Sequence, residues 1–557
     1  MRFSTLPFVL SIISIHAKEL LSRQTEWQVG QPVSTSSGTV TGHDGGNDTK
    51  VSEYLGIPFA EPPIGKFRFA APRKFVGTAQ LNGTKFVKPG SSSPTPDELA
   101  KANLTAETAI VDNLFTDHNQ VNEDCLYLNV WTKPQVGEKK KAVLVWIYGG
   151  AFNTGSSSIN AYNGRNLAAL EDVVVVSLKC AAPLTRLAIE WVRDNIEKFG
   201  GDSSRISIFG QSAGASSIDF YTYAWESDPI ASGFIMESGT VFSWGLPNSA
   251  STTTAAWFST SQKLGCGNST SPSNSVLSCM QSKSPEEIYA AIPSGPASEI
   301  LGSFGPTIDN SIVFSNYSGR APANVPVLLG NNDYEAGLFR TEFSMHGIEL
   351  SETFWTDFNL QEFTCPCSDR ANSSIAAKVP TWRYRYMGVY PNLEISPKAG
   401  AWHGAEIPLI FNTAPENMSS TAEEIATGKY IRGAWSAFAK NPSDGLTKYG
   451  WPKYDPTQDT LVRIGRKDIP GPSLINPYRY DADCPFFNVS STDPSKFPDV
   501  PDYGASVTPT GTGGEAPSAT GSTIPPISSA NSASTLNTRA VGVFGSTSLM
   551  MIFGRHF

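Results

Sequence analysis

Four short runs of apolar residues stand out along the chain and predict β-strands. They are AVLVWIY (142–148), VVVVS (173–177), ISIF (206–209) and VPVLL (325–329). Each run is continuous rather than alternating, which is typical of strands that are buried on both faces. We therefore predict a sheet that lies inside the molecule.

Two segments predict helices that cover this sheet. In LAIEWVRDNIEKF, between the second and third runs, apolar residues recur at helical spacing with charged residues opposite them. A second helix is predicted over 421–440, before Pro442. Strand, helix and strand form a βαβ unit, so we predict an α/β fold, with a mixed, mostly parallel central sheet and helices on both faces.

The N-terminus differs in composition from the body of the chain at 25–502. Residues 1–17, MRFSTLPFVLSIISIHA, combine an early arginine, an apolar run and a final small residue. We interpret them as a signal peptide that is too short to span a membrane, the alternative being a buried N-terminal segment.

The C-terminus contains two further segments. Residues 503–534 are rich in Ser, Thr, Pro and Gly, which predicts a disordered stalk. Residues 535–557 contain the apolar stretch VGVFGSTSLMMIF, and together with the small residues at 531–533 they resemble a GPI-anchor signal. The alternative is a frayed tail.

Composition and charge narrow the possible partners and the compartment. The 557 residues carry a net charge of −9, which argues against nucleic acid as a partner. Seven cysteines favour disulfides with at least one thiol left over, and we predict the pair Cys266–Cys279. Eight N-x-S/T sequons fit a secreted, extracellular glycoprotein. They lie at Asn47, Asn82, Asn103, Asn268, Asn316, Asn372, Asn417 and Asn488.

The segment ISIFGQSAGASS contains the pattern G-x-S-x-G around Ser212. The pattern alone is common by chance. Here it follows a predicted buried strand and precedes a plausible helix, which is the setting that a strained turn with an exposed nucleophilic serine requires. The N-terminus of that helix favours developing negative charge.

A serine hydroxyl needs a base, which in this arrangement follows it in the chain. Of the histidines after Ser212, His556 lies in the tail and His346 is too close to the best acid candidates. His403 remains. For the acid, Asp333 and Glu335 both sit at the end of the fourth predicted strand, and spacing alone does not choose between them.

Backbone N–H groups are also needed to bind the negative oxygen that develops on a carbonyl under attack. WIYGGAF follows the first predicted strand, and Gly149 and Gly150 allow close approach of the backbone. We predict that Gly150, Ala151 and Ala213 donate these groups.

Several motifs, in order, resemble the type B carboxylesterases, the cholinesterase-like branch of the α/β-hydrolase fold, and most of all their secreted fungal members. The resemblance covers about residues 38–490. It rests on YLGIPFAEPPIGKFRFAAP (54–72), EDCLYLNVW (123–131), WIYGGAF, FGQSAGASS, ESGT (237–240), NDYEAGLF, VPTWRYRYMGVYPNL (379–393) and WHGAEIPLIF.

The resemblance implies hydrolysis of carboxylic esters through an acyl-enzyme. Ser212 would be the nucleophile, His403 the base and Glu335, rather than Asp333, the acid. Other matching positions would support these residues or the structure without reacting. They are Gly149, Gln211, Ser238, Glu406, Glu123 and Asp124. No metal or organic cofactor is implied, and the expected partners are small-molecule or lipid esters. Trp244 and the segment 84–121 are candidate walls of the substrate pocket.

The chain departs from the family pattern in two places. No cysteine precedes Cys125, so the disulfide that the family forms there has no upstream partner. Between VVVVS and the following helix only six residues, 178–183, replace a much longer connection, and Cys180 lies within them. The short join is either a true deletion or a mis-spliced gene model, and we favour the second. A true deletion would damage the pocket and lower stability.

These departures leave a competing hypothesis open. Some cholinesterase-like domains are non-catalytic adhesion or interaction modules, and these typically lack a catalytic residue. Here Ser212, Glu335 and His403 are all present, so an active esterase or lipase is the leading interpretation. A cell-surface protein whose anchored stalk matters more than its chemistry is a third.

Overall fold

The computed structural model describes the main body of the chain with short gaps. The described residues are 27–46, 48–86, 110, 122–134, 140–178, 185–245, 247–293, 304–345, 347–414 and 419–484. The predicted signal peptide, stalk and tail lie outside them. So do nearly all of the 84–121 segment, residues 179–183 of the short join, and His346.

The described strands form two sheets. A small sheet has the order β1-β2-β5, and a sheet of 11 strands has the order β14-β13-β12-β11-β10-β9-β7-β8-β6-β4-β3. The strands are β1 (Val33–Thr35), β2 (Gly38–Thr41), β3 (His43–Asp44), β4 (Ser52–Pro58), β5 (Gln80–Asn82), β6 (Tyr127–Thr132), β7 (Lys141–Ile147), β8 (Val174–Leu178), β9 (Gly201–Gln211), β10 (Gly233–Glu237), β11 (Val327–Asn332), β12 (Thr381–Tyr386), β13 (Leu461–Ile464) and β14 (Ser473–Ile475).

The centre of the large sheet is parallel and its outer strands are antiparallel. Parallel pairing runs from β8 through β7, β9, β10, β11 and β12 to β13. The strands β6, β4, β3 and β14 pair antiparallel. All four predicted runs are strands of the parallel part, which confirms the predicted fold class.

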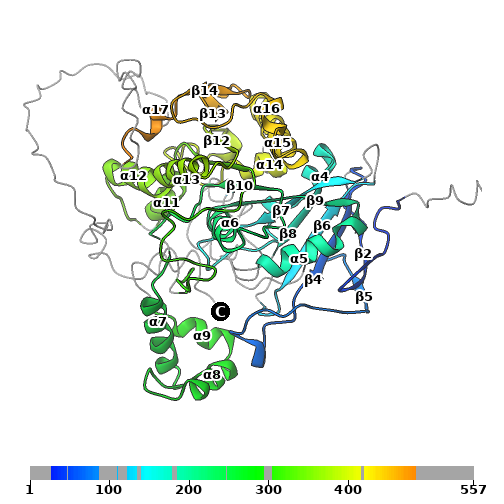
Figure 1. Ribbon diagram of the computed structural model, residues 1–557, viewed down its shortest axis with the longest axis vertical. Coiled ribbons are helices and arrows are strands. Elements are labelled where there is room, and N and C mark those ends of the chain that lie inside the picture. Colours follow the sequence, from blue (N-terminus) through cyan, green and yellow to red (C-terminus); the bar gives the residue numbers. More distant parts are fainter. Residues whose placement is uncertain are drawn as a thin grey trace, which may run out of the picture.

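Helices cover both faces of this sheet (Figure 1). They are α4 (Arg165–Glu171), α5 (Thr185–Asn195), α6 (Ala213–Ala224), α7 (Ala250–Lys263), α8 (Ser273–Ser282), α9 (Pro285–Ala291), α11 (Ala336–Met345), α12 (Glu352–Asn359), α13 (Cys365–Ala376), α14 (Ile407–Phe411), α15 (Ala422–Lys440), α16 (Gly445–Tyr449) and α17 (Tyr478–Asp481). A single π-helical turn, η5 (Leu360–Thr364), joins α12 to α13.

Strand β7 illustrates why the apolar runs are continuous. Its residues alternate between two hydrophobic clusters, with Trp146 in one and Val145 in the other. The first cluster packs against α15 through Trp435, and the second packs against α5 through Trp191. A strand that lies between two helical layers is buried on both faces, which explains why its apolar residues are continuous rather than alternating.

The two predicted helices are present. The first is α5, which continues as a short 3-10 turn, Ile196–Phe199. The second is α15, whose first turn is capped by the Thr421 side chain accepting from the backbone N–H of Glu424 at 3.1 Å.

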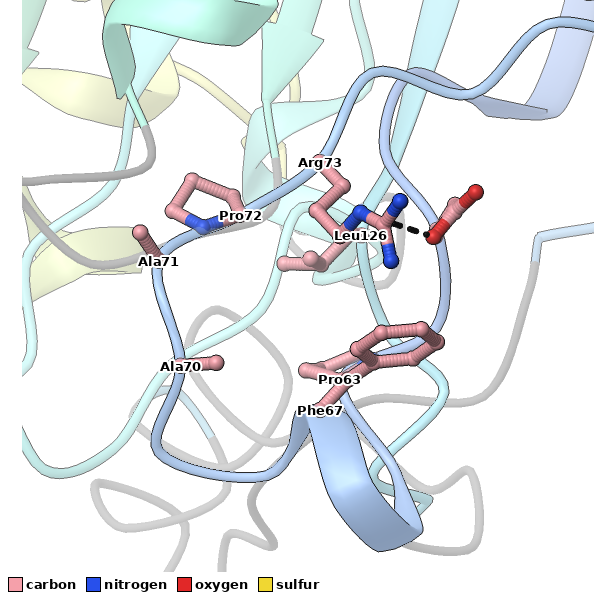
Figure 2. Close-up of a pocket in the computed structure, with 8 residues that line it drawn as sticks. Pro63, Phe67, Ala70, Ala71, Pro72, Arg73 and Leu126 are labelled. Carbon is pink, nitrogen blue, oxygen red and sulfur yellow. Dashed lines mark ion pairs between the residues drawn. The ribbon is translucent and has the colours of Figure 1, made fainter.

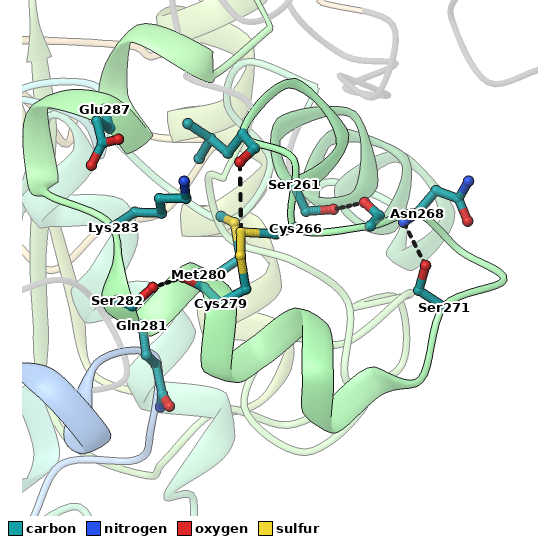
Figure 3. The surroundings of a disulfide bond; sticks show 12 residues. Ser261, Cys266, Asn268, Ser271, Cys279, Met280, Gln281, Ser282, Lys283 and Glu287 are labelled. Carbon is teal, nitrogen blue, oxygen red and sulfur yellow. Dashed lines mark hydrogen bonds between the residues drawn. A yellow bond between two sulfur atoms is a disulfide. The ribbon is translucent and has the colours of Figure 1, made fainter.

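A helical lobe, α7 to α9, projects from the body near the lower edge of Figure 1. The predicted disulfide Cys266–Cys279 lies in it, as Figure 3 shows. Its small core is formed by Cys266, Val276 and Met280. A second disulfide, Cys365–Cys484, ties the start of α13 to the end of the described chain, a pairing that the sequence left open.

Candidate active site

Ser212 stands in the turn between β9 and α6. Its backbone has φ 58° and ψ −128°, a conformation that costs energy for any residue other than glycine. A side chain at Gly214 would lie 2.1 Å from the backbone oxygen of Ile147, and one at Gly210 would lie 2.5 Å from the same atom. Both glycines of the motif are therefore required by the close approach of this turn to the end of β7.

Glu335 and His403 meet beside this turn. The Nδ1 atom of His403 lies 2.6 Å from Oε2 of Glu335. The other carboxylate oxygen, Oε1, accepts from the Ser238 hydroxyl at 2.6 Å and from the Asn332 backbone N–H at 2.5 Å. Glu335 is fully buried, so these contacts hold it in one orientation.

Asp333 has a different role. It forms a buried ion pair with Arg385 of β12, with Nε 2.5 Å from Oδ1. The same guanidinium also donates to the backbone oxygen of Asp333 at 2.8 Å. Of the two acids that spacing left open, Glu335 is the one that contacts His403.

The second nitrogen of His403 contacts Gln211, the residue before Ser212. Nε2 of the imidazole lies 3.0 Å from Nε2 of the Gln211 carboxamide. Ser212 is 8% exposed and its hydroxyl forms no hydrogen bond with another described residue. The histidine therefore lies beside the serine but is bonded to its neighbour.

The loop after β7 approaches the same turn. Gly150 has φ 120° and Ala151 has φ 51°, and a side chain at Gly149 would lie 2.8 Å from the Ser212 Cβ. The backbone N–H groups of Gly150, Ala151 and Ala213 donate to no other described residue. They are available to an external acceptor.

Two more carboxyl groups are buried behind Glu335. Burial, together with the charge of Glu335, raises the pKa of Glu406 to about 8. Burial, with Glu406 nearby, also raises the pKa of Glu237. Glu406 accepts from the Asn332 amide, and Glu237 accepts from the Trp435 indole at 2.7 Å. Each keeps one oxygen without a partner among the described residues.

Aromatic side chains surround the His403 ring. Ring centroids of Phe363, Phe339 and Trp244 lie 5.0, 5.4 and 6.5 Å from it. Phe363 is supplied by the π-helical turn η5, a distortion that often occurs at functional sites. Trp244, predicted as a pocket wall, does lie next to the histidine.

A small pocket lies away from this site, in the segment that precedes β5 (Figure 2). Arg73 crosses it, with its Nε 3.5 Å from Oε2 of Glu61 and its guanidinium 4.8 Å from the Phe67 ring centroid. None of the residues that line this pocket belongs to the predicted catalytic set.

The supporting motif residues also have contacts. Glu123 pairs with Arg68, and Asp124 accepts from the Tyr127 hydroxyl at 2.9 Å. The described sequon residues Asn82, Asn268 and Asn316 are exposed, whereas Asn372 is half-buried and accepts from the Tyr454 hydroxyl at 3.3 Å. Asn47, Asn103, Asn417 and Asn488 lie outside the described residues.

Sequence reasoning missed Asn332 and Arg385. Asn332 bonds Glu335, Glu406 and the Trp402 backbone oxygen, and Arg385 binds Asp333. Asn332 directly precedes Asp333 at a strand end, which was a usable signal. Arg385 lies in a strand 52 residues away, and no local pattern marks it.

Comparison with known proteins gives consistent results. The family model described as "Carboxylesterase family" matches residues 30–179, 185–363 and 348–474 of this chain. Secreted lipase 5 of Gibberella zeae and chlorogenic acid esterase of Aspergillus niger are each 29% identical, over 78% of this chain and 90% of their own length. Acetylcholinesterase of Bungarus fasciatus is 27% identical over 82% of this chain and 86% of its own.

The fold and these similarities define an α/β-hydrolase that acts on carboxylic esters. The chain belongs to the carboxylesterase family, as its motifs predicted. The family match is interrupted at residues 180–184, which is where the short join was noted.

Proposed function

We propose that this protein is a secreted serine esterase with a Ser212–His403–Glu335 triad that acts through an acyl-enzyme. The observation that carries the proposal is the 2.6 Å contact of Glu335 with His403 beside a serine in a strained turn. Three separate segments of the chain supply the three residues, and Ser238 and Asn332 hold the acid in place.

The proposed reaction has two steps. Ser212 Oγ attacks the ester carbonyl while His403 Nε2 takes its proton, and His403 then returns this proton to the departing alcohol. Water attacks the acyl-enzyme in the same way, giving up one proton to His403, which passes it to Ser212 as the acid leaves. Glu335 stays ionised and stabilises the imidazolium.

The N–H groups of Gly150, Ala151 and Ala213 are proposed to bind the oxyanion. Their lack of other acceptors among the described residues supports this role. Donors that are already oriented cost no reorganisation during the reaction, and each is worth roughly 3 kcal/mol of barrier.

The proposed substrates are small-molecule or lipid esters. The names of the two fungal relatives, a secreted lipase and a chlorogenic acid esterase, support both the ester class and an extracellular location. Among the described residues no helix is long and apolar enough to cross a membrane. Attachment through a C-terminal lipid anchor stays a prediction from residues 535–557.

The test is hydrolysis of short- and long-chain p-nitrophenyl esters by the secreted protein. Ser212→Ala should reduce kcat at least about 1000-fold, because no other group replaces the nucleophile. Ser217→Ala is the matched control, since among the described residues its hydroxyl bonds only the Ala213 backbone oxygen of the same helix. Full activity in folded Ser212→Ala would overturn the proposal.

The interrupted family match at 180–184 favours one alternative, a catalytically impaired interaction module. A folded wild-type chain that hydrolyses no ester would support it. Sequencing the transcript across 178–183 would then decide whether the verified protein carries this join.

A further inference from the structure

The contact between Gln211 and His403 restricts what the histidine can do in the free enzyme. Glu335 is an acceptor at Nδ1, so in the neutral ring Nδ1 carries the proton and Nε2 offers a lone pair. The carboxamide of Gln211 must then donate its N–H to Nε2 across 3.0 Å. Nε2 is the atom that the proposed reaction needs for the proton of Ser212.

The Gln211 side chain has little freedom to leave this position. It is 4% exposed, and the backbone of Gln211 pairs with Glu237 of β10. On its other side, Gly149 leaves no room for a side chain, because a Cβ there would lie 2.8 Å from the Gln211 Oε1 atom. The contact is therefore built by two strands and the loop after β7.

Several carboxyl groups lie near His403, and Glu335 is the one whose oxygen contacts its ring. Glu335 bonds the ring, Glu406 lies one turn further along the chain, and Glu237 ends the neighbouring strand. From η5, the buried Glu362 lies next to Phe363, and its pKa is raised by burial. The nearby cation Arg385 is already bound by Asp333.

Negative charge favours the protonated imidazolium, which cannot act as a base. A donor to Nε2 has the opposite effect, because a hydrogen bond to the neutral form disfavours the charged form. Gln211 is the described contact of His403 that acts in this direction. A carboxylate at position 211 could only accept from Nε2, and it would add a negative charge to the one that Glu335 already places against the ring.

We propose that Gln211 is a positioning residue. In the free enzyme it keeps the proposed base, His403, neutral and hydrogen-bonded at Nε2. On this view His403 exchanges the amide for the Ser212 hydroxyl when substrate is bound. The inference rests on the proposed function, in which Nε2 of His403 accepts the proton of Ser212. The residue acts through His403 and does not touch the reacting bond.

The test follows the titration of the His403 ring by NMR in the full chain. The His403 signal is assigned by its loss in His403→Gln. Gln211→Glu should raise the midpoint by about one pH unit or more, because an acceptor replaces a donor. Ser212→Ala should leave the midpoint unchanged, because the serine is not the partner of Nε2. Gln458→Glu, which adds the same charge at an exposed site, is the matched control.

The opposite result, a midpoint that moves in Ser212→Ala and not in Gln211→Glu, would overturn the inference. Should Gln211→Glu fail to fold, Gln211→Met removes the donor without adding charge. The acid limb of its kcat/KM profile should move to higher pH by roughly half a unit, the equivalent of one ordinary hydrogen bond. A merely structural role would lower kcat and leave this limb in place.

Failure of this inference differs from failure of the proposed function. The latter is decided by ester hydrolysis in Ser212→Ala, whereas the titration of His403 requires no turnover. An active enzyme whose His403 midpoint is insensitive to residue 211 would reject Gln211 as a positioning residue and retain the triad.

Discussion

The site at the carboxyl ends of β9, β10 and β11 and the helical lobe α7–α9 are held together by different means. In the site, Glu335 is bonded by residues 3, 68 and 97 positions away in the chain. In the lobe, the disulfide spans only 13 positions and the caps are local, as in the Ser284–Glu287 capping box. The site depends on tertiary structure and the lobe on a covalent link and local caps.

The difference has an energetic consequence. Each buried carboxylate of the site loses its hydration and needs partners supplied by other strands. Removing one partner leaves a charge or a lone pair unsatisfied in a low-dielectric interior. The lobe buries few charges, so its weak point is the entropy of its unfolded loop.

The largest expected effect comes from Glu335, the acid of the proposed triad. Glu335→Gln keeps the size of the side chain but removes the charge that stabilises the imidazolium, and kcat should fall about 10000-fold. The fold should persist, as measured by circular dichroism. Asp357→Asn, on the exposed side of α12, is the control and should retain activity.

The second effect concerns the other carboxylate at the same strand end. Asp333→Asn leaves the buried Arg385 guanidinium without its counter-charge, and the free energy of unfolding should fall by about 3–5 kcal/mol in a urea titration. Asp333→Asn/Arg385→Met should recover part of this loss, because it removes the unpaired charge. Loss of catalysis with unchanged stability would reverse our assignment of the two acids.

A third prediction tests whether the lobe can be destabilised without loss of activity at the site. Cys266→Ser/Cys279→Ser should lower stability by about 3 kcal/mol, the loop entropy that a link of this length removes. Ester hydrolysis at 25 °C should be retained, because the proposed catalytic residues lie in the other region. Thermal unfolding and initial rates measure the two quantities. A parallel loss of activity would mean that the lobe shapes the site.

The last effect, small per pH unit, is a dependence of stability on pH. The pKa of Glu406 is about 8 in the folded chain because the group is buried beside Glu335, against 4.5 unperturbed. Between these values the folded state holds a proton that the unfolded state has lost, so stability falls as pH rises from about 4.5 to 8. The slope is at most about 1.4 kcal/mol per pH unit. Glu406→Gln should flatten it in urea titrations at several pH values. An unchanged slope would indicate that Glu406 is ionised.

Several elements could be predicted from the chain because their causes are local. The runs at β7, β8, β9 and β11 are apolar on both faces, and α15 carries its own cap. Strand β12 was not predicted. Its arginines are buried, and they suit a central strand only because Asp481 and Asp333 neutralise them from distant positions.

From the chain alone it was possible to predict the fold class, the strained turn at Ser212, His403 as the candidate base and the lobe disulfide. Each follows from spacing, strand burial or a short list of candidates. Only the tertiary structure assigned Asp333 to Arg385, placed Gln211 on the histidine and gathered three carboxyl groups behind the site. Those facts depend on which strand ends lie together, and on the cost of burying a charge there.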